Sequence, residues 1–216
     1  MRLRAITPIV VSEEELTRRR VRYAALAPPG VTIHLDNLTT GPDRLESSGQ
    51  IRESEQLVYE EALRTNLDRF DGIFLDCVLD PALERLQTES ALPVFGMTRL
   101  VSTYLASLGL RMAAVARNRA IADELADRID AYGWSSNLDG VLILDLSLAD
   151  ISDTDLWNQV VAERVANGDL AGVDAVINGC SAVEVRPLGG PPVLDPTALS
   201  LRLIGLGVPL FGQERP

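Results

Sequence analysis

Short apolar runs of strand length alternate along the chain with longer stretches in which apolar residues recur every three or four positions. The first pattern is typical of buried strands, and the second of helices that pack on a sheet. Strands are expected at residues 4–6, 31–35, 72–75, 112–115, 141–144 and 175–177, and helices at residues 13–26, 59–70, 121–132 and 157–165. This alternation predicts an α/β fold built on parallel sheets.

Three short motifs occur twice in the chain, in the same order. The first is an aspartate, an apolar strand and a cysteine, and such repetition indicates a duplicated unit. The matched segments are residues 71–77 with 174–180, 78–83 with 193–199, and 92–96 with 208–212. We therefore predict two lobes of like topology: residues 1–96, which carry Cys77, and residues 97–216, which open on a hinge helix at 97–108 and carry Cys180.

Each cysteine directly follows a predicted parallel strand, the position where open α/β sheets bind their ligands. Two facing lobes would place the thiols on opposite walls of one cleft. Inverting a carbon that bears an acidic hydrogen needs this arrangement, because a base must act on one face and an acid on the other. The alternative is that both cysteines are buried and act as small apolar side chains.

A thiol can serve as the base if a nearby helix N-terminus lowers its pKa. Asp80 with Pro81, and Asp195 with Pro196, have the pattern of an N-cap followed by the first helical residue. The first pair adjoins Cys77, whereas a loop rich in Pro and Gly separates the second from Cys180.

Charge that develops on a carbonyl or carboxylate oxygen requires preorganised donors. The residues expected to contact the substrate follow the strand ends: Thr7 with the adjacent Pro8, Val78 and Leu79 after Cys77, and Ser181 after Cys180.

The composition restricts the class of partner. The chain has 216 residues, 46% of them hydrophobic, and a formal net charge of -11. That charge argues against binding to nucleic acid or to an anionic membrane, and no apolar run is long enough to span a bilayer. We therefore expect a cytoplasmic protein with free thiols, a small-molecule substrate and a possible homo-oligomer.

Two other groups of residues are expected to be structural. The chain has a single histidine, His34, which excludes a zinc site with several His ligands. We expect His34 at the edge of a sheet or on the surface. Arg18, Arg19, Arg20 and Arg22 share a helix with a run of glutamates, a pattern that favours a solvated face with i,i+4 ion pairs.

At these motifs the sequence resembles the aspartate/glutamate racemase superfamily, and within it the hydantoin/allantoin racemase branch. Cys77–Leu83 resembles the branch pattern of Cys, two residues, Asp-Pro, a small residue and Leu, and Leu92–Gly96 resembles its next strand. Asn178–Ser181 resembles its Gly-Cys signature. Gly41-Pro42 and Leu45-Glu46-Ser47 also resemble its Gly-Pro and Ile-Glu-Ser stretch. The resemblance covers nearly the whole chain.

This resemblance implies two Rossmann-like lobes related by a pseudo-twofold axis, no cofactor, and a racemase or epimerase that acts through Cys77 and Cys180. The sequence departs from the branch at two strand ends. Thr7–Val10 replaces Asn-Pro-Asn-Thr, and Val115–Asn118 replaces hydroxyl residues. At the second, Arg117 or Arg119 is a candidate clamp for a carboxylate; a solvated arginine at a helix start is the alternative. We also expect the closing helix of the family to be absent.

Fold does not determine the reaction. Relatives implied by the same resemblance include arylmalonate decarboxylases and maleate isomerases. A cysteine-dependent lyase or isomerase, and a two-lobed small-molecule binder without catalysis, are therefore the competing hypotheses.

Overall fold

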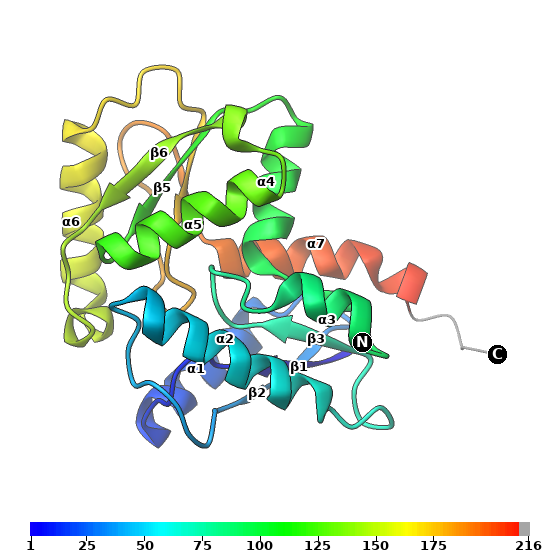
Figure 1. The fold of residues 1–216 in the computed structure, drawn as a ribbon. Helices are drawn as coiled ribbons and strands as arrows, with labels where there is room; N and C mark the ends of the chain where they lie inside the picture. Colours follow the sequence, from blue (N-terminus) through cyan, green and yellow to red (C-terminus); the bar gives the residue numbers. More distant parts are fainter. Residues whose placement is uncertain (212–216) are drawn as a thin grey trace.

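The computed structural model describes residues 1–211, with side chains through residue 207. The chain forms two α/β lobes, each built on a four-stranded parallel sheet (Figure 1). The elements, in order, are β1 (Arg2–Ile6), α1 (Glu13–Leu26), β2 (Thr32–Asp36), α2 (Ser48–Leu63), β3 (Gly72–Leu75), α3 (Leu83–Glu89), β4 (Val94–Phe95), α4 (Met97–Ser107), β5 (Met112–Ala116), α5 (Arg119–Ala131), η1 (Ser135–Asn137), β6 (Leu138–Ile143), η2 (Ala149–Ser152), α6 (Thr154–Asn167), β7 (Ala175–Asn178), β8 (Val193–Leu194) and α7 (Pro196–Phe211).

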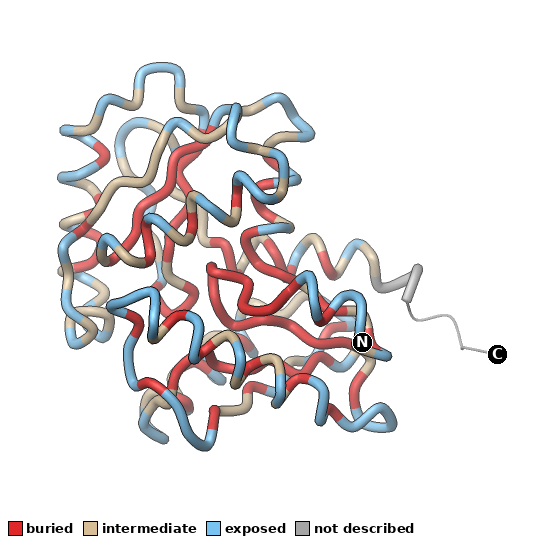
Figure 2. Tube along the Cα trace, viewed as in Figure 1, coloured by how far each residue is buried: buried red, intermediate tan, exposed pale blue. Residues whose placement is uncertain are grey.

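The two sheets repeat one topology. Their strand orders are β2-β1-β3-β4 and β6-β5-β7-β8, and every pair of neighbouring strands is parallel. The central strands β3, β5 and β7 are buried along their whole length, as Figure 2 shows for the middle of each lobe. Burial on both faces explains their continuous apolar runs. The predicted α/β class with two lobes is confirmed.

Local signals place α1 and β2 as expected. Ser12 caps α1 by accepting a hydrogen bond from the backbone N–H of Glu15, and the three glutamates of the first turn face the positive end of the helix dipole. His34 is exposed on β2, an edge strand of the first sheet, which confirms its predicted position.

The helix expected at residues 59–70 is misplaced. Helix α2 ends at Leu63 and buries a different stripe, which includes Ile51 and Val58, while Leu67 is 56% exposed. The side chain of Asn66 accepts hydrogen bonds from the backbone N–H groups of residues 68 and 69, which stabilises a turn after the helix.

Helices α4 and α7 lie between the lobes (Figure 1). Each follows the last, two-residue strand of its own sheet, and the two helices pack against each other. Helix α7 also contacts α1 of the first lobe. The hinge segment is therefore a helix, as predicted, whereas the division of the chain at residue 96 stays a prediction.

The match of residues 208–212 with the strand segment 92–96 is wrong, as is the expected absence of a closing helix. Helix α7 continues through Phe211, and Gly212 lies outside the described residues. The carboxylate of Asp195 caps this helix by accepting from the N–H groups of Thr197 and Ala198. The true counterpart of β4 is β8, so the match of residues 193–199 with 78–83 is also wrong.

Asp80 does not cap the helix beside Cys77. Its backbone is left-handed, with φ 46°, as is that of Ala82, which directly precedes α3. The Asp80 carboxylate instead accepts from the N–H groups of Thr98 at 3.0 Å and Arg99 at 2.7 Å, and from the Tyr132 hydroxyl at 2.9 Å. Asp80 therefore caps α4 and links it to the end of α5.

Burial raises the pKa of Asp80 to about 6, against about 4 in an unfolded chain. A carboxyl with a raised folded pKa favours folding while it is protonated, and this contribution is lost as pH rises through the folded pKa. We therefore expect the free energy of unfolding of the wild type, relative to Asp80→Asn, to fall between about pH 4 and about pH 6. Denaturant titrations of both proteins measure this difference, and a rise over that interval contradicts it.

Candidate active site

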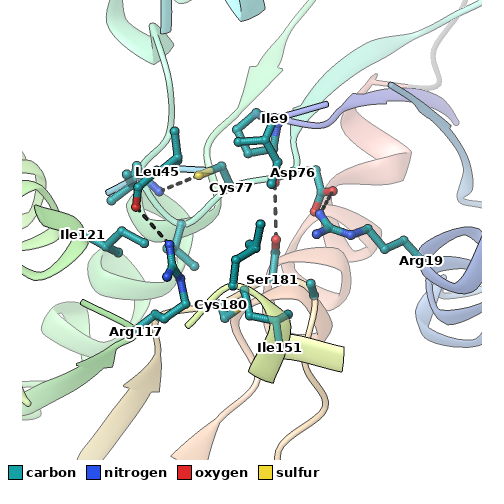
Figure 3. A pocket seen from close by; sticks show the side chains of 16 residues that line it. Ile9, Arg19, Leu45, Asp76, Cys77, Arg117, Ile121, Ile151, Cys180 and Ser181 are labelled. Carbon is teal, nitrogen blue, oxygen red and sulfur yellow. Dashed lines mark hydrogen bonds and ion pairs between the residues drawn. The ribbon is translucent and has the colours of Figure 1, made fainter. Parts of the chain in front are cut away.

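Four parallel strands direct their carboxyl ends to one pocket that residues of both lobes line (Figure 3). Strand β1 leads toward Pro8, β3 into Cys77, β5 into Arg117 and β7 into Cys180. The lining residues are Pro8, Ile9, Arg19, Leu45, Asp76, Cys77, Val78, Leu79, Arg117, Ile121, Leu148, Ile151, Gly179, Cys180, Ser181 and Ala182. The repeated topology therefore brings the two cysteines to a common pocket.

Cys77 is 7% exposed, and its Sγ accepts a hydrogen bond from the backbone N–H of Leu79 at 3.4 Å. Burial raises the pKa of this thiol to about 12. The Leu79 N–H opposes that rise, whereas the nearby carboxylates of Asp76 and Asp80 add to it. The surroundings of Cys77 favour its neutral form.

Cys180 is partly exposed and lies among cations. Burial raises the pKa of its thiol, but the Ala182 N–H and the guanidinium groups of Arg19 and Arg117 oppose the rise. Asp76 acts in the other direction. The two thiols therefore have unequal electrostatic surroundings, although they occupy equivalent places in the repeat.

The loop that carries Cys180 is held from its own lobe. Asn178 donates from Nδ2 to the carbonyl oxygens of Cys180 at 2.9 Å and Val183 at 3.3 Å. The indole N–H of Trp157 donates to Asn178 Oδ1 at 3.1 Å, which fixes the orientation of the amide. The Asn178 side chain thus fixes the backbone of the loop that carries Cys180.

Gly179 allows β7 to end against β5. A Cβ atom at this position would lie 2.0 Å from the backbone oxygen of Val115. Only glycine fits such a close approach of two backbones.

The first lobe also holds the Cys180 loop. Ser181 Oγ donates to the carbonyl oxygen of Asp76 at 3.3 Å, which joins the residue before one cysteine to the residue after the other. From α1, Arg18 donates to the Ala182 carbonyl at 2.9 Å, and Arg22 donates to the Ser181 carbonyl at 3.3 Å. Arg22 also pairs with Asp195 at 2.7 Å.

The expected solvated arginine face is therefore wrong for most of α1. The side chains of Arg19 and Arg22 are only 7% and 11% exposed, whereas Arg20 points to solvent and pairs with Glu13. Leu16, Arg19 and Tyr23 share one buried stripe of the helix, at the spacing of i, i+3 and i+7. This spacing is the sequence signal that could have identified Arg19.

Arg117 is buried, so the solvated alternative is wrong for this residue. Its guanidinium donates to the carbonyl oxygens of Leu45 at 3.0 Å and Leu146 at 3.2 Å. Within the described residues its ion pair is with Glu46, at 3.7 Å, and that side chain is 47% exposed. Burial lowers the pKa of Arg117. A buried cation with one distant, solvated counter-ion favours an anion in the pocket.

Most of the expected contact residues line the pocket, and one does not. Cys77, Cys180, Pro8, Val78, Leu79, Arg117 and Ser181 all contribute to its walls. Thr7 instead turns its hydroxyl to the Ile9 carbonyl oxygen at 2.9 Å and is fully buried. Arg119, the other clamp candidate, is exposed and pairs with Asp123.

From the sequence, Asp76 could be recognised only as a polar residue at the end of a strand, and no sequence pattern marked the apolar residues that line the pocket.

Within residues 1–207, no group of three or more His, Cys, Asp or Glu side chains is placed to hold a metal ion. Across the described part of the chain, no helix is long and apolar enough to cross a membrane.

A family model described as Asp/Glu/Hydantoin racemase matches residues 6–204. The solved allantoin racemase from Klebsiella pneumoniae superposes with a TM-score of 0.80 at 19% identity, over 97% of this chain and 88% of that one. The allantoin racemase from Pseudomonas fluorescens gives 0.81 at 17%, over 100% and 98%. The maleate isomerase from Pseudomonas putida S16 gives 0.68 at 16%, over 97% and 93%. No curated protein matches the chain. At these identities the structural likeness shows a shared fold.

Proposed function

Because the chain belongs to the Asp/Glu/Hydantoin racemase family, we propose that it is a cofactor-independent racemase or epimerase with Cys77 and Cys180 as opposed acid and base. One observation carries the proposal: the two thiols follow equivalent strands of two repeated sheets and line one pocket. Both are free cysteines, and the chemistry requires that they stay so, which favours a reducing compartment.

In the proposed reaction one thiolate removes the hydrogen from a carbon next to a carbonyl or carboxylate. The electron pair moves onto the oxygen, and the opposite thiol then delivers its proton to the other face of the carbon. The developing negative charge needs donors that are already in place. Arg117 is suited to this role, because its guanidinium is buried, lines the pocket and pairs with a half-exposed carboxylate, that of Glu46, at 3.7 Å.

The walls of the pocket indicate the remainder of the substrate. Apolar side chains from both lobes surround the cysteines, namely Ile9, Leu45, Ile121, Leu148 and Ile151. Such walls favour burial of an apolar substituent. We therefore propose a small amino-acid derivative or hydantoin with an apolar substituent.

Arg117→Met is expected to reduce kcat/KM by about 10- to 100-fold, because a hydrogen-bonded charge contributes roughly 1.5–3 kcal/mol. Arg119→Met is the matched control, since it removes an exposed arginine two residues away. Steady-state kinetics of both variants measure the effect. Equal kinetics for Arg117→Met and Arg119→Met contradict the role given to Arg117.

The proposed activity is tested by incubating the protein with single enantiomers of substituted hydantoins and amino acids and following optical activity. Racemisation of at least one substrate class supports the proposal. Stable optical activity across the panel, with a folded protein, contradicts it.

A cysteine-dependent lyase or isomerase is the second candidate, and the unequal surroundings of the two thiols favour it. In that chemistry one cysteine is the nucleophile or the sole proton donor. Separate serine substitutions distinguish the candidates, because a single-cysteine enzyme loses activity in only one variant.

A further inference from the structure

Helix α1 of the first lobe contacts the loop that carries Cys180, a residue of the second lobe. Arg18 and Arg22 bind carbonyl oxygens of residues 181–183, the segment that follows this cysteine. Arg19 lies between them in sequence and lines the same pocket as Cys180 (Figure 3). The helix therefore holds the loop with two arginines and presents a third to the pocket.

Two carboxylates bind the Arg19 guanidinium, and a tyrosine holds one of them in place. The guanidinium donates to Glu15 Oε1 at 2.7 Å and to Asp76 Oδ2 at 3.2 Å. The other oxygen of Asp76 accepts from the Tyr23 hydroxyl at 2.5 Å. Tyr23 and Asp76 are 2% and 1% exposed. Because the Arg19 side chain is 7% exposed and held by these contacts, its positive charge lies beside the pocket and not in solvent.

The charged groups around the two thiols differ in sign. Arg19 and Arg117 favour the thiolate of Cys180, whereas Asp76 opposes it. Around Cys77 both carboxylates, Asp76 and Asp80, oppose ionisation. Cys77 is the more deeply buried of the two thiols. Asp76 is common to the two sites, so the charged groups that distinguish them are the two arginines beside Cys180 and Asp80 beside Cys77.

We propose that Arg19 is a positioning residue that makes Cys180 the first of the two thiols to ionise, so that the singly ionised pair keeps its remaining proton on Cys77. The consequence for catalysis rests on the proposed function. The singly ionised enzyme would then be ready to deprotonate the enantiomer whose hydrogen faces Cys180. Because the equilibrium constant of a racemisation is one, kcat/KM must be equal for the two enantiomers. The difference between the thiols is therefore expected to appear as unequal kcat values, with KM values that differ in the same ratio.

The test is site-resolved alkylation of the intact protein by iodoacetamide across a range of pH, with each cysteine followed by peptide mass spectrometry. The thiolate is the reacting form, so the pH midpoint reports ionisation separately from access to the thiol. In the wild type we expect the Cys180 midpoint to lie below that of Cys77. A Cys77 midpoint equal to or below that of Cys180 overturns the proposal.

Arg19→Gln removes the charge and retains hydrogen-bond donors. We expect its Cys180 alkylation at neutral pH to slow by roughly three- to tenfold, with a larger rise in midpoint for Cys180 than for Cys77. Arg19→Lys should restore much of the wild-type profile, and Arg20→Gln, on the exposed side of the helix, should match the wild type. Equal shifts at both cysteines, or no shift, overturn the role of Arg19.

If Arg19→Gln does not fold, the midpoints of the wild type and of Arg19→Lys still test the role of Arg19. Equal midpoints for Cys180 and Cys77 in a folded Arg19→Lys protein contradict a role for its positive charge. Alkylation needs no substrate. A protein that shows the expected midpoints but racemises nothing contradicts the proposed function alone, whereas racemisation with reversed midpoints contradicts this inference alone.

Discussion

Replacement of either cysteine by serine is expected to lower kcat for racemisation by about 10²- to 10⁴-fold, the usual contribution of a general acid or base. A serine hydroxyl is close in shape to the thiol but far too weak an acid to exchange its proton at neutral pH. Both variants should fail alike, because a racemase needs a group on each face of the carbon. The expectation holds for Cys77→Ser and Cys180→Ser in both reaction directions.

Chiral chromatography of each reaction measures the loss, and a thermal melt of each variant shows whether it remains folded. Cys77 is buried, so some loss of stability is expected from a polar group at that position. Ser181→Ala is a useful comparison, since it removes a hydroxyl next to Cys180 and leaves both thiols. Full racemisation by either serine variant would exclude the two-thiol scheme.

Gly179→Ala is expected to be the most damaging substitution outside the cysteines. The added Cβ would lie 2.0 Å from the backbone oxygen of Val115, where no side-chain movement can relieve the contact. Strand β7 must therefore move away from β5, and Cys180, the next residue, moves with it. We expect a loss of about 1–3 kcal/mol in the free energy of unfolding, as for overpacked cores, together with a loss of racemisation.

Gly189→Ala is the matched control. Gly189 lies in the same connection between β7 and β8, and a Cβ there meets nothing within 4 Å. Its stability and activity should stay at the wild-type level. Denaturant titration and chiral assays of the two variants give the comparison. A Gly179→Ala protein with wild-type stability and activity would show that the β5–β7 contact does not position Cys180.

The larger elements were predictable because they carry long, regular signals. Helix α1 has a cap, acidic residues in its first turn and a buried stripe, and its bounds match the expectation. The short strands were not. Strands β4 and β8 have two residues each, too few for a periodicity. The residues at 208–212 resemble the β4 segment, but the Asp195 cap starts a helix that continues past Pro209.

The candidate site was predictable to the extent that sheet geometry determines it. Residues after parallel strands meet at one edge, which predicted from the repeat that Cys77 and Cys180 share a pocket. Arg117 was one of two candidates, with Arg119, at a strand end where the sequence departs from the family. Arg19 was missed because a run of arginines beside glutamates is typical of a solvated face. Its buried stripe with Leu16 and Tyr23 could have been recognised, whereas its pairing with Asp76 beside the pocket depends on tertiary packing, which no local pattern specifies.

The most direct test of the two-thiol mechanism follows the hydrogen itself in deuterium oxide, with a substrate that the wild type racemises. We expect each enantiomer to give the opposite one with a solvent deuterium at the inverted carbon. Cys77→Ser should exchange only the enantiomer that faces Cys180, with retention, and Cys180→Ser only the other one. Exchange of the same enantiomer by both variants, or inversion without solvent deuterium, would contradict the two-thiol mechanism.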